Sequence, residues 1–255
     1  MPAIYDRQLG PALFGPFAQH LAGVAASFEP ARVLELGAGS GIATRALRRA
    51  LPTAEITATD LNPAMVAWGA EQVTDVTWAP ANAQELDFPD ACFELVVCQF
   101  GVMFFPDKPA AFREAARVLV PGGRMLFSVW DAVEASEFPA ALVAALHAVL
   151  PGNPPDFVAR VPHGYFDPDR ILSDVEAGGL EPEAVEHVVL SGRAQTARSL
   201  AEGFCLGTPL RFALQERGAL EDLAREVGEE MTRLLGEGPI DGESAAFVVT
   251  ARRPN

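Results

Sequence analysis

The sequence predicts an α/β fold, a doubly wound, mostly parallel seven-stranded sheet with helices on both faces and a helical insertion before the last strand. Three observations predict it. Short apolar runs alternate with helical patterns from residue 31 onward, as in repeated strand–helix units. The run Phe93–Phe100 is almost continuously apolar, which is typical of a central parallel strand. A mostly helical stretch at 196–235 lies between the last two segments with strand character.

The first half of the chain reads as strand–helix units joined by short connections. Asn62 and Pro63 supply a capping side chain and a first-turn proline for one helix. Pro121-Gly122-Gly123 is expected to end the last helix of this half sharply. The predicted strands are 32–36, 55–60, 76–79, 93–100 and 124–130, and the predicted helices are 42–51, one that begins after Asn62, and 109–119.

After Trp130 the pattern loosens, and two loop-like stretches interrupt it. The helical stretch before the last strand reads as an insertion between two strands of the sheet, not as a separate domain. The predicted elements are helices at 136–150 and 168–179, a strand at 184–192, the helical segment 196–235 and a strand at 244–253.

The overall composition is that of a folded, acidic protein. At 255 residues the chain is long enough to bury a sizeable α/β core. Apolar residues make up 49% and the mean hydropathy is +0.16, which excludes a disordered chain. The net charge of −15 argues against nucleic acid as the main partner and against anionic membrane surfaces, because both select basic faces.

Cysteine usage and the N-terminus point to the cytoplasm. Cys92, Cys98 and Cys205 are odd in number and form no C-x-x-C pair, which is typical of buried reduced thiols. The opening MPAIYDRQLG has neither the charged region nor the apolar core of a signal peptide. No apolar run approaches the roughly 20 residues of a membrane helix. We therefore expect a cytoplasmic protein with no membrane insertion and no metal.

The segment VLELGAGSGIAT (33–44) reads as a buried strand, a glycine-rich turn and the start of a helix. Such a turn lets backbone N–H groups come close to a ligand. Its spacing is G-x-G-x-G, and Ile42 stands where the dinucleotide fingerprint has its third glycine. A phosphate loop would need a lysine after the glycines, and Arg45 is misplaced for that role. Neither of these two phosphate-binding motifs is therefore present.

Asp60 closes the second predicted strand, 23 residues after Gly37. In a doubly wound sheet, ligands bind beyond the carboxyl ends of the strands, and an acid there can accept hydrogen bonds from two ribose hydroxyls. These features indicate a ligand that carries a ribose and shows no sign of a pyrophosphate. The alternative role for Asp60 is to cap the helix that opens at Asn62.

Four segments together resemble the motifs of class I S-adenosylmethionine-dependent methyltransferases, over roughly residues 31–130. The resemblance is greatest to the small-molecule branch that includes quinone-biosynthesis C-methyltransferases. It implies S-adenosylmethionine as the cofactor and S-adenosylhomocysteine as the product. The segments are VLELGAGSGIAT (33–44), ATDLNPAMV (58–66), ANAQELDFPDACFELVVCQFGVMFFPD (81–107) and AAFREAARVLVPGGRMLFSVW (110–130).

The resemblance also implies cofactor-binding roles for nine residues. They are Gly37, Ala38 and Gly39 under the methionine and ribose, Glu35 at the amino acid end, Asp60 at the ribose hydroxyls, Leu61 on the adenine, Asn82 and Ala83 at the adenine amino group, and Gln99 near the methionine carboxyl and the methyl group. The family usually has Asp-Ala where this chain has Asn82-Ala83. An amide oxygen can still accept from the adenine amino group.

The resemblance implies one domain over residues 1–255. It would consist of a helical cover at 1–30, a cofactor-binding core at 31–130, and, at 131–255, substrate-side helices plus the last two strands. The cover is expected to include a mobile lid at 4–17, because this segment combines aromatic side chains with glycines and prolines. The alternative is a fixed helix packed on the sheet edge.

Methyl transfer from a sulfonium is an in-line displacement that depends mainly on holding the two reactants together. A hydroxyl or acidic-carbon acceptor would also need a base. The candidate bases are His163, Tyr165, Tyr5 and His20. The cluster Phe100, Met103, Phe104 and Phe105 either lines the acceptor pocket or packs in the core. The expected partner is a small-molecule substrate, and the acceptor atom and a homodimer are left open.

The sequence bears on three alternative functions. A short-chain NAD(P)-dependent oxidoreductase requires Tyr-x-x-x-Lys, but Leu9 and Asp169 follow Tyr5 and Tyr165 at that spacing. NPPDF (153–157) is similar to the N-P-P-aromatic signature of DNA amino-methyltransferases, but it does not follow the fourth strand and its fourth residue is an aspartate. A non-catalytic cofactor-binding or regulatory protein on the same fold stays open.

Overall fold

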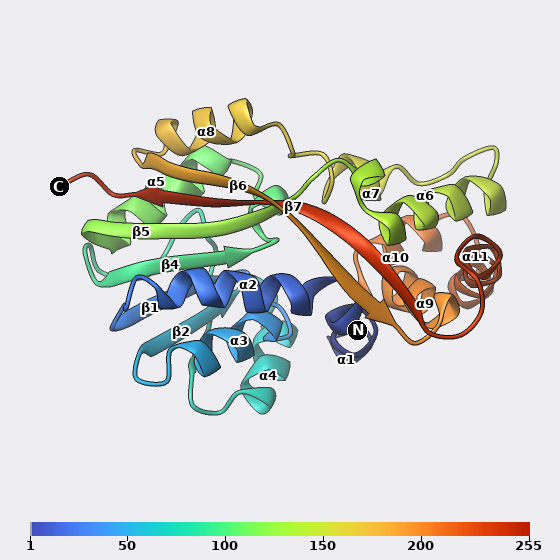
Figure 1. Cartoon of the computed structure of the whole chain (residues 1–255), viewed down its shortest axis with the longest axis horizontal. Coiled ribbons are helices and arrows are strands. Elements are labelled where there is room, and N and C mark those ends of the chain that lie inside the picture. Colours follow the sequence, from blue (N-terminus) through green and yellow to red (C-terminus); the bar gives the residue numbers. More distant parts are fainter. Residues whose placement is uncertain (1) are drawn as a thin grey trace. The chain divides into compact units, whose positions relative to one another are not determined.

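A seven-stranded sheet organises the chain, and the computed structural model describes residues 2–255 (Figure 1). The strand order is β3-β2-β1-β4-β5-β7-β6. Strands β1 to β5 pair in parallel, and β7 pairs antiparallel with β5. The predicted mostly parallel, seven-stranded sheet is confirmed. The strands are β1 Arg32–Leu36, β2 Glu55–Asp60, β3 Thr77–Pro80, β4 Phe93–Gln99, β5 Leu119–Trp130, β6 Glu181–Ala194 and β7 Ile240–Arg252.

Helices cover both faces of the parallel part of the sheet, with α5 and α8 on one face and α2, α3 and α4 on the other (Figure 1). The predicted insertion between the last two strands is confirmed as α9, α10 and α11. The helices are α1 Pro2–Ile4, the π-helix η1 Tyr5–Phe14, α2 Gly15–Ala26, α3 Ile42–Ala50, α4 Pro63–Gln72, the 3₁₀ turn η2 Val102–Phe104, α5 Lys108–Val118, the 3₁₀ turn η3 Val133–Ala135, α6 Glu137–Val149, α7 Phe157–Arg160, α8 Pro168–Ala177, α9 Ala197–Gly207, α10 Leu210–Gln215 and α11 Leu220–Leu235.

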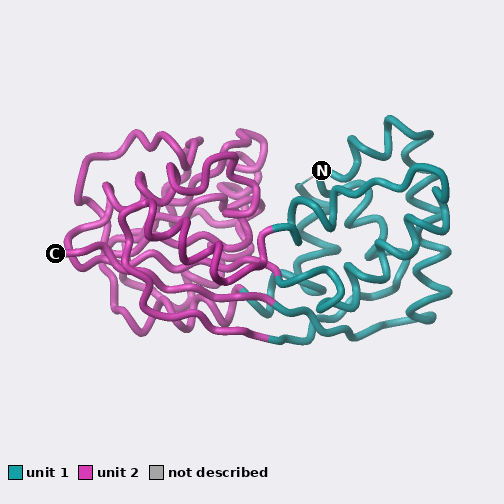
Figure 2. Tube along the Cα trace, turned by 90° about the horizontal axis from the view of Figure 1, so that it is seen from above, with its two compact units in different colours: residues 1–17, 131–164, 189–245 teal, residues 18–130, 165–188, 246–255 magenta. Residues whose placement is uncertain are grey.

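The chain forms two compact units, each built from three separate stretches of sequence (Figure 2). Unit 1 consists of residues 1–17, 131–164 and 189–245, and unit 2 of residues 18–130, 165–188 and 246–255. Unit 2 contains all of β1 to β5, and unit 1 contains α9 to α11. The single domain expected over 1–255 stays a prediction.

The helix starts of unit 2 follow the capping signals in the sequence. The Asn62 side chain accepts a hydrogen bond from Ala64 N at 3.0 Å and begins α4. The Asp107 side chain accepts from Ala110 N at 2.9 Å and begins α5. Both caps satisfy backbone N–H groups that have no partner within the helix. The first two strands also begin and end at the predicted residues, because turn signals in the sequence bound their apolar runs.

Strand β5 begins at Leu119, five residues before the predicted start, and runs through Pro121-Gly122-Gly123. The C-terminal segment explains this, because Gly122 N donates to Arg253 O and Arg253 N donates to Gly123 O. A Cβ on Gly123 would lie 2.9 Å from Val120 O and 3.1 Å from Glu94 O. Pairing with the C-terminal segment therefore keeps Pro121-Gly122-Gly123 in the sheet, although its local sequence would be expected to end a helix or strand.

The N-terminal segment of unit 1 forms the π-helix η1, which packs closely on β6 and α9. A Cβ on Gly192 would lie 1.9 Å from Ala12 O, and one on Gly207 would lie 3.1 Å from Tyr5 N. A Cβ on Gly203 would meet the Leu9 side chain at 2.7 Å. Gly192 and Gly207 thus let the backbone of η1 approach, and Gly203 leaves room for side chains of η1. These contacts favour the fixed alternative for 4–17, and the lid stays a prediction.

Candidate functional site

The glycine turn connects β1 to α3 through three residues with left-handed backbone. The φ angles of Gly37, Gly39 and Gly41 are +66°, +56° and +88°, which glycine adopts without steric cost. Ala38 N donates to Thr59 O at 2.9 Å, so the turn is fixed to the end of β2. A Cβ on Gly37 would lie 3.7 Å from the Cα of Gly101, just beyond β4. The turn therefore lies at the carboxyl edge of the parallel strands, as predicted.

Asp60 ties this turn to the start of α4. Its Oδ2 accepts from Gly39 N and its Oδ1 accepts from Asn62 N, each at 2.8 Å. The side chain that caps α4 is Asn62, so the helix-cap alternative for Asp60 is wrong. Each carboxylate oxygen has a second lone pair, which leaves acceptor capacity for ribose hydroxyls. Partial burial raises the pKa of Asp60, and the bonds from Asn62 and Gly39 oppose that shift.

Glu35 is a fully buried carboxyl at the end of β1. Only 1% of the residue is exposed, and its Oε2 has no hydrogen-bond partner among residues 2–255. Burial raises its pKa to about 7, the neighbouring Thr44 hydroxyl lowers it, and Asp60 raises it further. A buried carboxyl oxygen without a donor fits a ligand that brings a cation, such as the ammonium of an amino acid.

The adenine side of the predicted site is more exposed to solvent than the buried Glu35. Leu61 is 73% exposed directly after Asp60, while Ala83 is buried. The Asn82 Oδ1 accepts from Gln84 N at 3.1 Å and so closes a local turn. The amide oxygen that the sequence assigned to adenine therefore already has one protein donor, and a base can use its second lone pair. Nothing in the local sequence distinguishes these two uses of an asparagine.

The carboxyl end of β4 carries Gln99, which lies opposite Ser128 of β5. The next residue, Phe100, has φ +53°, which is uncommon for a bulky side chain. Its ring stacks on Trp130 with centroids 3.5 Å apart, a pair that the sequence did not indicate. Phe100 and Met103 are buried, whereas Phe104 is 45% exposed. Phe100 and Met103 therefore pack in the core, and an acceptor-lining role for this cluster stays a prediction.

Two of the four candidate bases belong to unit 2 and have carboxylate partners there. Tyr165 is 3% exposed and donates to Asp174 Oδ2 at 2.9 Å. Burial and this bond raise its pKa, which makes Tyr165 unsuited to accept a proton at neutral pH. The Nε2 of His20 lies 3.3 Å from Glu186 Oε2 on β6.

The other two candidates belong to unit 1. The ring of Tyr5 stacks on Phe14 with centroids 4.9 Å apart. His163 is buried, and its Nδ1 lies 2.7 Å from the Asp131 carbonyl oxygen, so Nδ1 carries the proton of that bond. Burial lowers the pKa of His163, which favours the neutral imidazole that a base requires.

Residues 2–255 show neither a cluster of metal ligands nor a membrane-spanning helix. They contain no group of three or more His, Cys, Asp or Glu placed to hold a metal ion. None of the helices in that range is long and apolar enough to cross a membrane.

Residues 34–127 match the family model described as a methyltransferase domain. This match, the glycine turn and Asp60 identify the chain as carrying a domain of the class I S-adenosylmethionine-dependent methyltransferases. S-Adenosylmethionine is the cofactor of that class, and the buried Glu35 and the turn held by Asp60 fit its amino acid and ribose parts. The predicted family and cofactor are thus confirmed.

Among curated proteins, the chain is similar to two kinds of relative. It is 38% identical over 102 residues to the ubiquinone/menaquinone biosynthesis C-methyltransferase UbiE of Proteus mirabilis, which covers 37% of this chain and 41% of the relative. It is 40% identical over 104 residues to the malonyl-[acyl-carrier protein] O-methyltransferase of Halorhodospira halophila, which covers 40% of this chain and 35% of the relative. The similarity therefore spans less than half of each of these relatives.

The similarity in fold extends over most of the chain. The YcgJ protein from Bacillus subtilis superimposes with a TM-score of 0.58 at 21% identity, covering 92% of this chain and 99% of that protein. At this level of identity the comparison shows the fold alone.

Proposed function

We propose that this protein transfers the methyl group of S-adenosylmethionine to a small-molecule acceptor. The observation that carries the proposal is the Asp60 carboxylate, which holds the glycine turn through Gly39 N and keeps lone pairs for a ribose. Ile42 replaces the third glycine of the dinucleotide fingerprint, and no lysine follows the turn to bind a pyrophosphate. Buried Glu35 adds a place for the cationic end of an amino acid.

The cofactor supplies an electrophilic methyl group, so that a bond from sulfur to carbon breaks as the bond from acceptor to carbon forms. The residues of the chain act by binding and orienting. Asp60 and the glycine turn fix the ribose, and Glu35 fixes the amino acid end. Holding two reactants at near-attack distance can supply up to about 7–11 kcal/mol in well-oriented systems. Methyl transfer can therefore proceed without a catalytic triad.

If the acceptor must lose a proton, His163 is the candidate base that we retain. It is buried, its Nδ1 is fixed by the Asp131 carbonyl, and its lowered pKa keeps it neutral at pH 7. The acceptor itself is proposed only as a class, because the two relatives are named for a quinone pathway and for a malonyl-carrier protein and for C- and O-methylation. We further propose that the protein acts in the cytoplasm, in keeping with its three free cysteines.

Calorimetry and a label-transfer assay test the function. S-Adenosylmethionine and S-adenosylhomocysteine are expected to bind with micromolar affinity, and NAD(P) is not. With deuteromethyl-labelled cofactor and a small-molecule extract, we expect a product about three mass units heavier than the product of unlabelled cofactor, because three deuterium atoms replace three hydrogens. Binding of NAD without either sulfur compound would contradict the proposal. Cofactor binding with no label transfer to any fraction would favour a regulatory protein instead.

A further inference from the structure

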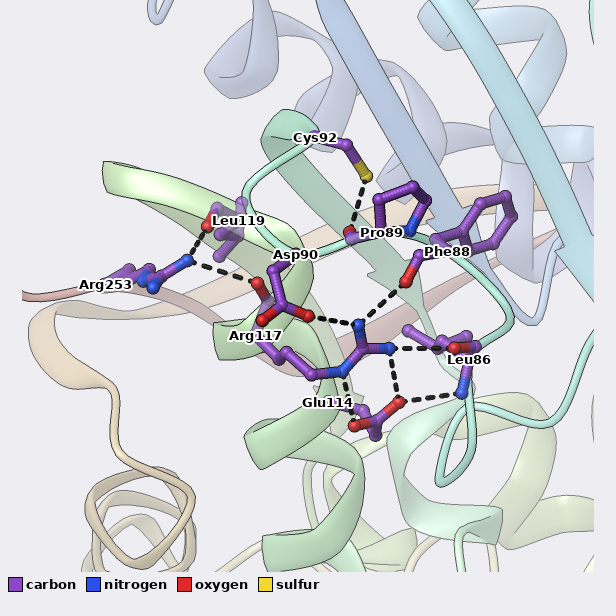
Figure 3. A network of polar contacts seen from close by, with 9 residues as sticks. All are labelled: Leu86, Phe88, Pro89, Asp90, Cys92, Glu114, Arg117, Leu119 and Arg253. Carbon is purple, nitrogen blue, oxygen red and sulfur yellow. Dashed lines mark hydrogen bonds and ion pairs between the residues drawn. The ribbon is translucent and has the colours of Figure 1, made fainter.

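Arg117 on α5 reaches across to the loop that connects β3 to β4 (Figure 3). Its guanidinium donates to the carbonyl oxygens of Leu86 and Phe88 at 2.8 and 2.7 Å. It also donates to Asp90 Oδ1 at 2.8 Å and to both oxygens of Glu114, each at 2.8 Å. These five bonds use all five N–H donors of the guanidinium. The loop is thus held from one point by a planar, fixed set of donors.

Glu114 completes the arrangement from the same helix. Its Oε2 accepts from Leu86 N at 2.8 Å, so both backbone polar groups of Leu86 are bound by the Arg117–Glu114 pair. Leu86 is also buried, at 5% exposure. The two peptide planes that meet at this residue therefore have fixed orientations. We call Arg117 and Glu114 the loop clamp.

The loop clamp lies directly beside the predicted adenine contact in the chain. Asn82 O accepts from Glu85 N at 3.0 Å, and this bond closes the turn Asn82–Glu85 directly before Leu86. At its other end the turn is fixed by Ala81 N, which donates to Asp60 O at 3.1 Å. The turn is therefore fixed at one end by β2 and at the other by the loop clamp. Asn82 itself is exposed.

Resting on the proposed use of S-adenosylmethionine, we propose that Arg117 and Glu114 are positioning residues that set the recognition of the cofactor's adenine. They act through the turn Asn82–Glu85. A lysine in place of Arg117 has three donors on one nitrogen and cannot bind two carbonyls and two carboxylates in the same plane. The turn would then lose its fixed end while the sheet and the glycine turn keep theirs.

Calorimetry on Arg117→Lys with two ligands tests the proposal. S-Adenosylhomocysteine carries the adenine amino group, and S-inosylhomocysteine replaces it with a carbonyl. The variant is expected to bind the adenine compound about threefold more weakly, since at most one neutral hydrogen bond is lost, and to bind the inosine compound almost as well as the original protein does. The ratio of the two affinities should thus collapse. A purely structural role would weaken both ligands alike and leave that ratio unchanged.

Arg113→Lys is the matched control, because Arg113 is exposed on the same helix and its side chain has no hydrogen bond or ion pair among residues 2–255. It should bind both ligands as the original protein does. If Arg117→Lys does not fold, Glu114→Gln replaces it, since an amide keeps one acceptor but loses the two-oxygen contact with Arg117. An unchanged affinity ratio in the folded variant overturns this proposal alone. An original protein that binds neither sulfur compound overturns the proposed function and this proposal with it.

Discussion

The two turns on either side of the predicted cofactor site are held in different ways. The glycine turn after β1 is fixed by its immediate neighbours, through Ala38 N to Thr59 O and Gly39 N to Asp60. The turn Asn82–Glu85 depends on Arg117, which lies more than thirty positions later in the chain, on α5. The conformation of the first turn is therefore determined by a local motif, whereas that of the second depends on a helix that is distant in the sequence. We expect cofactor binding at the first turn to depend on the residues of that turn. We expect binding at the second turn to depend also on Arg117.

The largest effect is expected for Asp60→Ala, which removes the ribose acceptor and the bond to the glycine turn together. Loss of a charge-assisted acceptor should weaken S-adenosylhomocysteine binding by roughly 2 kcal/mol or more, about thirtyfold. Calorimetry measures it. Asn62→Ala is the control, because it removes only the cap of α4, costs about 1 kcal/mol of stability and should leave the affinity unchanged. Equal losses of affinity in Asp60→Ala and Asn62→Ala would show that Asp60 has only a structural role.

The second effect is a pH dependence set by Glu35. Its pKa of about 7 in the free protein means that its carboxylate form, which a cationic ligand prefers, increases through neutral pH. Affinity for S-adenosylmethionine should therefore rise about fivefold between pH 6 and 7, where a free α-amino group still keeps most of its proton. Glu35→Gln should flatten this profile. An identical rise in both proteins would assign it to another group.

The same group makes a prediction about stability without ligand. The folded-state pKa is raised from 4.5 to about 7, so between these values the native state binds more protons than the unfolded state. The free energy of unfolding then falls as pH rises through this window, by at most about 1.4 kcal/mol per pH unit. Denaturant unfolding should show the fall in the original protein and a smaller one in Glu35→Gln. A difference between the two that does not change with pH would contradict the burial argument.

A smaller effect is expected for Gly39→Ala, which tests the glycine turn through its backbone alone. At φ +56° an alanine costs about 1 kcal/mol of stability, although no atom lies within 4 Å of the added Cβ. Cofactor affinity should fall about fivefold, because the Cβ enters the predicted path of the cofactor. Gly179→Ala is a matched control, with φ +82° and equal space between α8 and β6. It should lose the same stability and no affinity.

The smallest effect is expected for Asn82→Ala, which tests the second turn at the predicted adenine contact. Losing one neutral hydrogen bond should weaken S-adenosylhomocysteine by about threefold. Asn82→Asp keeps the oxygen that accepts from Gln84 N, so it should bind nearly as well as the original protein. A loss larger than that of Asp60→Ala would reverse the comparison between the two turns.

Much of unit 2 could be predicted because its signals are local. Strand β1, strand β2 and the helix starts at Asn62 and Asp107 depend on apolar runs and capping side chains within a few residues. The glycine turn was predictable for the same reason, since its three left-handed residues must be glycine. Strand β5 was predicted too short, because its first residues pair with the distant C-terminal segment.

The sequence by itself determined the order of strands and helices, the glycine turn and the acid that follows β2, because each depends on residues that are neighbours in the chain. Only the tertiary structure decided which side chains support that site from a distance. Arg117 binds Leu86, and Phe100 stacks on Trp130, across about thirty positions in each case. The π-helix η1 likewise depends on glycines of β6 and α9. Such contacts leave no periodic pattern in the sequence, since they depend on where folded elements meet and not on what each residue prefers locally.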